Sequence, residues 1–171
     1  TTNITFEVIK GKLVTKEVHS TTIAPDILGS STTTKTDTIY NYDWQDIKGA
    51  NGITGSFYAP ISVNTTTSSS GSDIFGGEWS SPGYTIRQEY SLKNWNGKQV
   101  WGFDYVVINP DVTLPDGTIA QGGSQRLDAM AIGLITVTQT GSGKDIFDNE
   151  TNTTTNITFE VIKGKLVTKE V

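Results

Sequence analysis

Few side chains in this 171-residue chain are suited to catalysis. His19 is the single histidine and no cysteine is present, so thiolate nucleophiles and thiolate metal sites are excluded. No G-x-S-x-G motif accompanies His19, which we expect to be a surface or turn residue. Acidic pairs such as Glu89 with Asp104 resemble the paired carboxylates of glycoside hydrolases, but a chain with 18 acidic residues contains such pairs by chance. We therefore predict no enzymatic activity, no catalytic residue and no cofactor.

Two loops resemble ligand-binding motifs without completing them. Residues 141–144, "GSGK", lack the spacing and the following hydroxyl residue of a phosphate-binding loop. Residues 109–117, "NPDVTLPDG", contain carboxylates as calcium loops do, but their spacing fits no such loop. We predict turns in both places and no metal site.

The tryptophans are the residues best suited to binding a ligand. Aromatic faces can stack on sugar rings, whereas buried tryptophans fill the cores of β-sandwiches. Trp101 lies in an apolar run and is expected in the core. The three candidate ligand-binding residues lie outside that run: Trp44, Trp79 and Trp95. A carbohydrate-binding adhesin or module, with a host glycan or surface receptor as its partner, is therefore the alternative function.

Charge and composition narrow the class of protein. The formal net charge is −5, and the middle of the chain carries it, because residues 1–18 and 154–171 are each slightly basic. An acidic middle argues against nucleic acid as a partner. Threonine, serine, glycine and asparagine are abundant, and no apolar run approaches the ~20 residues needed to cross a bilayer. This composition is typical of a β-rich extracellular domain.

Strand patterns dominate the chain, and helical periodicity is hard to find. Residues 84–92 alternate between apolar and polar side chains, as a strand with one buried face does. Asn96 and Gly97 favour a two-residue hairpin turn, and residues 100–108 form the returning strand. Further strands are expected at residues 38–42, 53–63 and 130–139, with a turn at Asn51 and Gly52. Short strands separated by turns favour an all-β fold, an immunoglobulin-like β-sandwich.

One segment occurs twice without a change: "TTNITFEVIKGKLVTKEV" occupies residues 1–18 and again residues 154–171. We call these the N-terminal repeat and the C-terminal repeat. Three interpretations compete. A solenoid needs about three or more units, and nothing similar lies between these two. The segments could instead be ordinary strands, or one could be a remnant without a role.

The interpretation that we favour is a strand made for a neighbouring molecule. A sandwich that lacks one strand exposes an apolar groove and unpaired backbone groups. A strand from another subunit fills such a groove through ladder hydrogen bonds and through alternate side chains in pockets. A second repeat at the C-terminus would let one chain fill its own groove.

Residues 8–16, "VIKGKLVTK", carry a family resemblance. They resemble the N-terminal extension of chaperone–usher pilus subunits, in which an apolar residue, a polar residue, glycine, a polar residue and an apolar pair follow one another. The resemblance implies that Ile9, Gly11 and Leu13 point into the groove of a neighbour, with Gly11 at a tight point. The full candidate sets of donor-strand residues are Ile4, Phe6, Ile9, Gly11 and Leu13 in the N-terminal repeat and Ile157, Phe159, Ile162, Gly164 and Leu166 in the C-terminal repeat.

The resemblance also implies a function. The chain would be a structural subunit of a bacterial surface fimbria, in a self-complemented form, that polymerises by donor-strand exchange and supports adhesion. Its partners would be identical or related pilins, a periplasmic chaperone and an outer-membrane usher, and its location would be extracellular. Many such pilins carry two cysteines, which this chain lacks.

The alternation of the repeat does not decide which of its two faces points inward. Counting back by twos from Gly11 selects Ile9 but not Phe6 or Ile4, which lie on the other parity. A bulge near Ile9 would restore them to the inner face. The upstream part could instead be two-sided, or Lys10 and Gly11 could form a hairpin turn. The expected organisation is a donor segment (1–18), a sandwich body (19–147), a linker (148–153) and a second donor segment (154–171). Within the body, residues 64–72 are expected to form a solvated loop.

Overall fold

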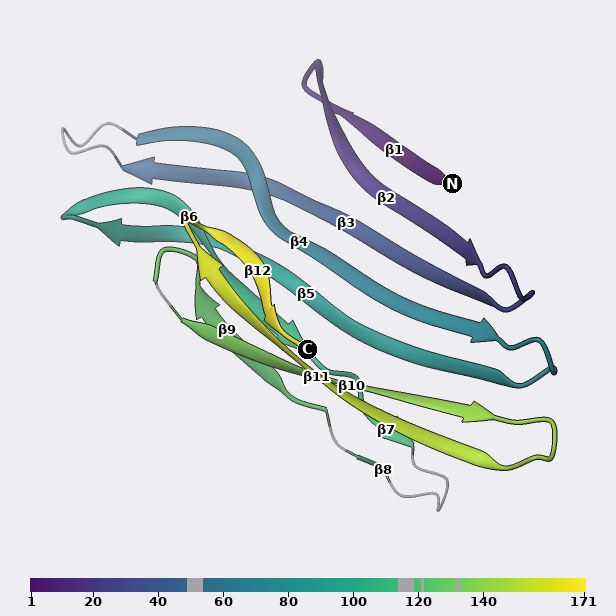
Figure 1. Cartoon of the computed structure of the whole chain (residues 1–171). Coiled ribbons are helices and arrows are strands. Elements are labelled where there is room, and N and C mark those ends of the chain that lie inside the picture. The colour runs from purple at the N-terminus through teal and green to yellow at the C-terminus, as the bar shows by residue number, and fades with distance from the viewer. Residues whose placement is uncertain (49–53, 114–118, 121, 132) are drawn as a thin grey trace.

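The computed structural model describes residues 1–48, 54–113, 119–120, 122–131 and 133–171. Over these residues the protein consists of antiparallel strands, turns and irregular segments (Figure 1). The predicted all-β class is therefore confirmed. The described residues contain no helix long and apolar enough to cross a membrane.

The described residues form twelve strands, several of them long. The first six are β1 (Thr2–Ile9), β2 (Lys12–Pro25), β3 (Ser31–Lys48), β4 (Thr54–Ser72), β5 (Glu78–Trp95) and β6 (Lys98–Ile108). The last six are β7 (Val112–Thr113), β8 (Ile119–Ala120), β9 (Ser124–Asp128), β10 (Leu134–Lys144), β11 (Glu150–Ile162) and β12 (Lys165–Glu170).

Ten of these strands form one sheet, and most neighbours in the sheet are also neighbours in sequence. The main path runs β1-β2-β3-β4-β5-β10-β11-β12, while β6 pairs with β5 and β9, and β7 pairs only with β8. One edge of β5 is shared by two strands. Its first residues, 78–80, pair with β10, and residues 85–95 pair with β6. Past residue 80, therefore, β10 leaves β5 and β6 takes its place.

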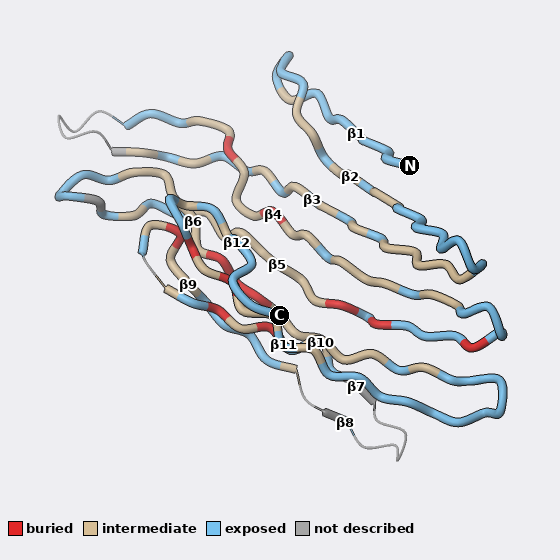
Figure 2. The backbone as a smooth tube through the Cα atoms, viewed as in Figure 1, coloured by how far each residue is buried: buried red, intermediate tan, exposed pale blue. Residues whose placement is uncertain are grey.

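That division of β5 produces two layers and a core between them. Buried side chains from β6 (Val107) and from β10 (Ile135, Val137) meet Phe159 of β11. Partly buried residues of β5, β9 and β12 pack against this cluster. The buried positions gather mainly where β6 and β9 overlap β10–β12, whereas β1 is exposed along nearly its whole length (Figure 2). The core thus lies at one side of the sheet, and β1–β3 extend from it as a single layer.

Three polar segments that we expected to be irregular are strands in whole or in part. Residues 141–144, where we predicted a turn, are the last residues of β10 and pair with β11. Residues 64–72 form the second half of β4, because threonine favours extended backbone and because both neighbours pair along it. Hydroxyls also pair across the strands, as between Thr38 and Thr65 at 3.2 Å. The predicted linker at 148–153 is shorter than expected, because β11 begins at Glu150.

The remaining sequence predictions agree with the structure only in part. Asn96 and Gly97 form the expected turn, with φ of 49° and 75°, between β5 and β6. The strand predicted at 130–139 begins only at Leu134. The turn at Asn51 and Gly52 lies outside the described residues. The immunoglobulin-like topology is not confirmed, since the main path is a meander rather than a set of crossed connections.

Candidate functional site

The two repeats fold as the same two-stranded hairpin. β1 pairs with β2 to form the N-terminal hairpin, and β11 pairs with β12 to form the C-terminal hairpin. Lys10 and Gly11 have φ of 47° and 79°, and Lys163 and Gly164 have φ of 50° and 77°. Positive φ at both central positions defines the two-residue turn whose twist matches that of the flanking strands. One sequence therefore gives one local structure in two different surroundings.

This turn replaces the single donor strand that the sequence suggested. The chain reverses at Lys10 and Gly11, so Ile9 and Leu13 lie on opposite strands rather than along one. Gly11 is at no tight point, because a Cβ built on it has no atom within 4 Å. The glycine is needed for its positive φ instead. Of the alternatives for the repeat, the hairpin turn is the one that the structure contains.

The C-terminal hairpin is part of the core. Phe159 and Val161 are 6% and 3% exposed, and the ring of Phe159 meets Tyr84 edge-on at 5.9 Å. Tyr105 donates a hydrogen bond from its hydroxyl to the carbonyl of Gly164 at 3.1 Å. We call the surface that receives this hairpin the acceptor site. Its main members are Tyr84, Tyr105, Val107, Leu127, Ile135 and Val137.

The N-terminal hairpin leaves the same side chains in solvent. Phe6 and Val8, the counterparts of Phe159 and Val161, are 53% and 66% exposed. The hairpin is attached to the sheet through β2, which pairs with β3 from Glu17 onward. Fully burying a side chain of this size is worth about 1.5–3 kcal/mol. The N-terminal repeat therefore carries an apolar face that has a known complement elsewhere in the same chain.

The inward face of the repeat differs from the predicted one at three positions. The residues of the C-terminal repeat that pack on the core are Ile157, Phe159, Val161 and Leu166. Ile162 points the other way and is 48% exposed, while Gly164 forms the turn. Val161 was missed, although the alternation of Ile157, Phe159 and Val161 was visible in the sequence. Leu166 returns to the same face because it is the cross-strand partner of Val161.

The bulge expected near Val8 and Ile9 is absent, and each hairpin has a register shift elsewhere. In each hairpin the register shifts opposite the phenylalanine, between Thr5 and Phe6 in one and between Thr158 and Phe159 in the other. The unpaired residue is on the returning strand, so β1 and β11 keep their own alternation intact. Phe6 and Ile4 therefore lie on one face of β1, and Ile9 lies on the other.

Three loops at the opposite end of the sheet share one structure. They connect β2 to β3, β4 to β5 and β10 to β11, and each begins with an aspartate, an isoleucine and a large apolar residue. In each loop the first aspartate, Asp26, Asp73 or Asp145, accepts a hydrogen bond from the backbone N–H two residues later. The fourth position has positive φ in all three, occupied by Gly29, Gly76 and Asp148. These loops recur every two strands along the main path.

The candidate sugar-binding tryptophans do not form one surface. Trp44 is 45% exposed and Trp79 is 39% exposed. They pair with residues of β4 that are thirteen positions apart, Tyr58 and Gly71, so about 40 Å of strand separates them. The side chain of Trp95 lies outside the described residues. Trp44 belongs to an aromatic cluster, in which its ring meets that of Tyr58 edge-on at 5.5 Å.

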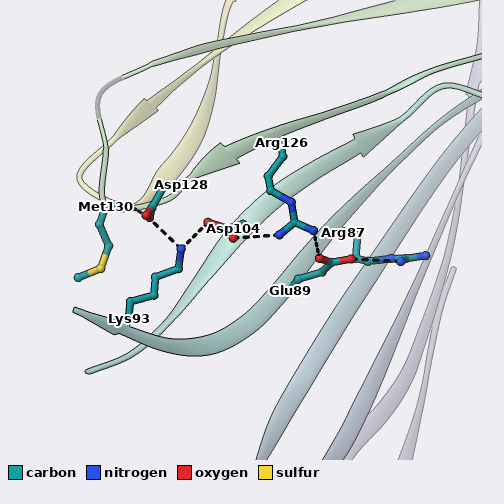
Figure 3. A network of polar contacts seen from close by, with 7 residues as sticks. All are labelled: Arg87, Glu89, Lys93, Asp104, Arg126, Asp128 and Met130. Carbon is teal, nitrogen blue, oxygen red and sulfur yellow. Dashed lines mark hydrogen bonds and ion pairs between the residues drawn. The ribbon is translucent and has the colours of Figure 1, made fainter. Parts of the chain in front are cut away.

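The acidic pair Glu89 and Asp104 belongs to a network of ion pairs on β5, β6 and β9 (Figure 3). Arg126 contacts both carboxylates, at 2.9 Å in the case of Asp104. Lys93 bridges Asp104 and Asp128, and the Nζ–Oδ2 distance to Asp128 is 3.0 Å. Both carboxylates of the pair are thus engaged by cations. The network ties together the layer that carries much of the acceptor site.

Hydrogen bonds set the ionisation of this network. The hydrogen bond from Arg126 holds the pKa of Glu89 below its ordinary value of 4.5. The backbone N–H of Met130, and then Lys93, lower the pKa of Asp128 below 3.8. Burial alone would lower the pKa of Lys93, but its hydrogen bonds to the two aspartates outweigh this and raise it. Glu89, Asp128 and Lys93 are therefore charged at neutral pH.

Comparison with protein-family models, with curated proteins and with solved structures finds no match for this chain. Over the described residues, no group of three or more side chains is arranged to hold a metal ion. The functional argument therefore rests on the two hairpins and on the acceptor site.

Proposed function

We propose that this protein is a structural subunit that joins copies of itself by hairpin exchange. The N-terminal hairpin of one molecule occupies the acceptor site of another, in place of that molecule's own C-terminal hairpin. The single observation that carries this proposal is the contrast between identical side chains. Phe159 and Val161 are buried on the acceptor site, while Phe6 and Val8, with the same flanking sequence, are exposed.

Complementarity between the two surfaces follows from sequence identity. The acceptor site binds a hairpin with the sequence of residues 154–171, and residues 1–18 fold into that hairpin. The two hairpins therefore compete for each acceptor site. The C-terminal hairpin is in the same chain, and a short tether gives an effective concentration in the millimolar range. Exchange is consequently favoured at high local concentration or when the C-terminal hairpin is displaced.

The wider role that we propose is that of a fimbrial subunit on a bacterial surface, supporting adhesion. The resemblance of residues 8–16 to pilin donor segments supports it, and so does an exposed apolar face with the same sequence as the one buried on the acceptor site. In this proposal the body is an immunoglobulin-like sandwich that the repeat completes, as a hairpin rather than as a single strand. Export, a periplasmic chaperone and an outer-membrane usher belong to the same proposal.

The duplicated sequence provides a matched test, because the same substitutions can be made in either repeat. The C-terminal variant carries Phe159→Asp and Val161→Asp, and the N-terminal variant carries Phe6→Asp and Val8→Asp. A four-site variant carries all of these. Sedimentation velocity over a range of concentrations measures association, and urea unfolding measures stability.

We expect the N-terminal variant to remain monomeric and nearly as stable as the parent chain. The C-terminal variant should be destabilised as a monomer and should form oligomers, because acceptor sites left empty take N-terminal hairpins from other molecules. The four-site variant should lose this association. The proposal is wrong if the C-terminal variant stays a monomer, or if it associates no better than the four-site variant.

A further inference from the structure

If hairpins exchange as proposed, the residues that adjoin the N-terminal hairpin move with it to the second molecule. Because residues 1–18 and 154–171 share sequence and fold, placing one hairpin where the other lies also places whatever is attached to it. The groups that contact the N-terminal hairpin in its own chain then arrive beside the acceptor site of the second molecule. Trp44 contacts the hairpin directly, and Ile27 follows it in the loop after β2; in the second molecule each of them meets a surface that lacks a partner.

The first group is Trp44. The Nζ of Lys10, at the tip of the N-terminal hairpin, lies 4.1 Å from the centroid of the Trp44 ring, a cation–π contact. Tyr58 braces the indole from the neighbouring strand. Lys163 is the counterpart of Lys10, and within the described part of the chain no aromatic ring lies under it. The C-terminal hairpin therefore has the lysine of this contact without the tryptophan.

A cleft lies next to that lysine. It has a volume of about 640 Å³, and the residues that line it include Ala129, Met130, Ala131, Val161, Ile162 and Lys163. Pockets that bind small molecules are typically roughly 300–1,000 Å³ in volume with mainly apolar walls, so this cleft has room for an indole. In the exchanged state Val8, Ile9 and Lys10 of the second molecule take the places of Val161, Ile162 and Lys163 beside Ala129, Met130 and Ala131. We propose that the indole of the second molecule's Trp44 fills the cleft formed in this way.

The second group is Ile27, whose exposed fraction of 98% is the highest among the large apolar residues that the structure describes. Each later loop places its isoleucine over the fourth residue of the loop before it. A Cβ built on Gly29 lies 3.6 Å from a γ-methyl of Ile74, and one built on Gly76 lies 3.8 Å from a γ-methyl of Ile146. Ile27 belongs to the first loop and has no loop before it.

The exchanged hairpin supplies the missing neighbour. The pairing of β1 with β2 continues to Thr1, whose carbonyl accepts a hydrogen bond from the N–H of Thr21. Continued at this register, residue 25 of the second molecule lies opposite Glu150 of the first. The loop that contains Ile27 then comes next to the loop at 145–149. Ile27 lies over Asp148, the residue equivalent to Gly29 and Gly76.

These two contacts select a second copy of this chain as the occupant. The cleft is next to Lys163, whose counterpart Lys10 contacts this indole in the other repeat. The added loop repeats a contact, isoleucine over the fourth residue of the preceding loop, that occurs twice within the chain. The interface therefore extends beyond the hairpin to both ends of the sheet.

The test uses the C-terminal variant, Phe159→Asp with Val161→Asp, because its acceptor site is left to N-terminal hairpins. Met130 is the single methionine of the chain and lines the cleft, so a ¹³C-methyl label on methionine gives one NMR signal from the site. The substitutions compared are Trp44→Leu and Ile27→Ser, with Trp79→Leu as the matched control. Sedimentation gives the dissociation constant of each.

We expect assembly to move the Met130 methyl signal upfield, as an aromatic ring above it does, and Trp44→Leu to abolish the shift. Trp44→Leu and Ile27→Ser should each weaken association by about tenfold, equivalent to ~1.4 kcal/mol, while Trp79→Leu should change neither readout. Assembly with an unchanged Met130 signal and unchanged affinities would overturn this inference alone. Absence of assembly in the C-terminal variant would overturn the proposed function and this inference with it.

Discussion

Replacing Phe159 with alanine should destabilise the protein far more than replacing Phe6 with alanine. Phe159 is 6% exposed and packs on Tyr84, Val107 and Ile135, so its loss should cost about 3–5 kcal/mol, the usual range for a buried phenylalanine. Phe6 is 53% exposed, and its loss should cost less than ~1 kcal/mol. The two changes occur in identical sequences, so differences in strand propensity and in the unfolded chain largely cancel.

The assay is urea unfolding of both variants and the parent chain, followed by tryptophan fluorescence and by circular dichroism. The expected difference in the free energy of unfolding is at least ~2 kcal/mol, with Phe159→Ala the less stable variant. The pair Val161→Ala and Val8→Ala should show the same order on a smaller scale, because Val161 is 3% exposed and Val8 is 66% exposed. Equal losses in the two repeats would refute the assignment of the C-terminal repeat to the core.

Three further predictions concern single groups. Hydrogen bonds from His19 to Asp37 and Glu17 raise the histidine pKa above 6.5, so NMR titration should give a midpoint above 6.5, and Asp37→Asn should lower that midpoint. The contribution of these hydrogen bonds to stability is complete below pH 6.5 and is lost as the pH rises through the folded pKa. The lowered pKa values of Glu89 and Asp128 stabilise the fold above pH 4.5 and above pH 3.8, respectively, and each contribution is lost as the pH falls through the folded pKa. Urea unfolding at several pH values should show that Arg126→Gln reduces the loss of stability that Glu89 causes. Gly164→Val should cost ~1–2 kcal/mol more than Gly164→Asn, because φ is 77° and asparagine tolerates that region better than valine; equal costs in thermal unfolding would point to a steric role for the glycine instead.

The strands of the body could be read from the sequence because their signals are local. Alternation at residues 84–92 and the Asn96–Gly97 dipeptide each depend on neighbouring residues alone, and both predictions agree with the structure. The strand at 64–72 could not be read, since its residues have no apolar periodicity. It is extended because β3 and β5 pair with it on both sides, and that information lies elsewhere in the chain.

The repeat shows why a motif match can mislead about conformation. The sequence around Lys10 and Gly11 is nearly symmetrical, with an apolar pair on each side of "KGK", and this symmetry suits a hairpin as well as a strand. Lysine is unfavourable at positive φ, which argued against the turn. Pairing between the flanking strands outweighs that cost in both repeats. The different burial of the two repeats was beyond any local signal, because their sequences are identical.

The most direct test of hairpin exchange is a disulfide between molecules, in a chain that has no cysteine of its own. Thr138 and Asn156 are cross-strand partners whose side chains hydrogen-bond at 3.0 Å, and Asn3 is the counterpart of Asn156 in the N-terminal repeat. A chain with Thr138→Cys and Asn156→Cys should close within one molecule. Within one molecule, Asn3 and Thr138 lie five strand spacings apart, roughly 24 Å, too far for a disulfide.

The measurement is a non-reducing gel of the Thr138→Cys, Asn3→Cys chain after mild oxidation at high protein concentration. Hairpin exchange predicts a ladder of covalently joined molecules that collapses to monomer on reduction. A chain that stays monomeric under conditions in which the Thr138→Cys, Asn156→Cys chain closes completely would contradict it.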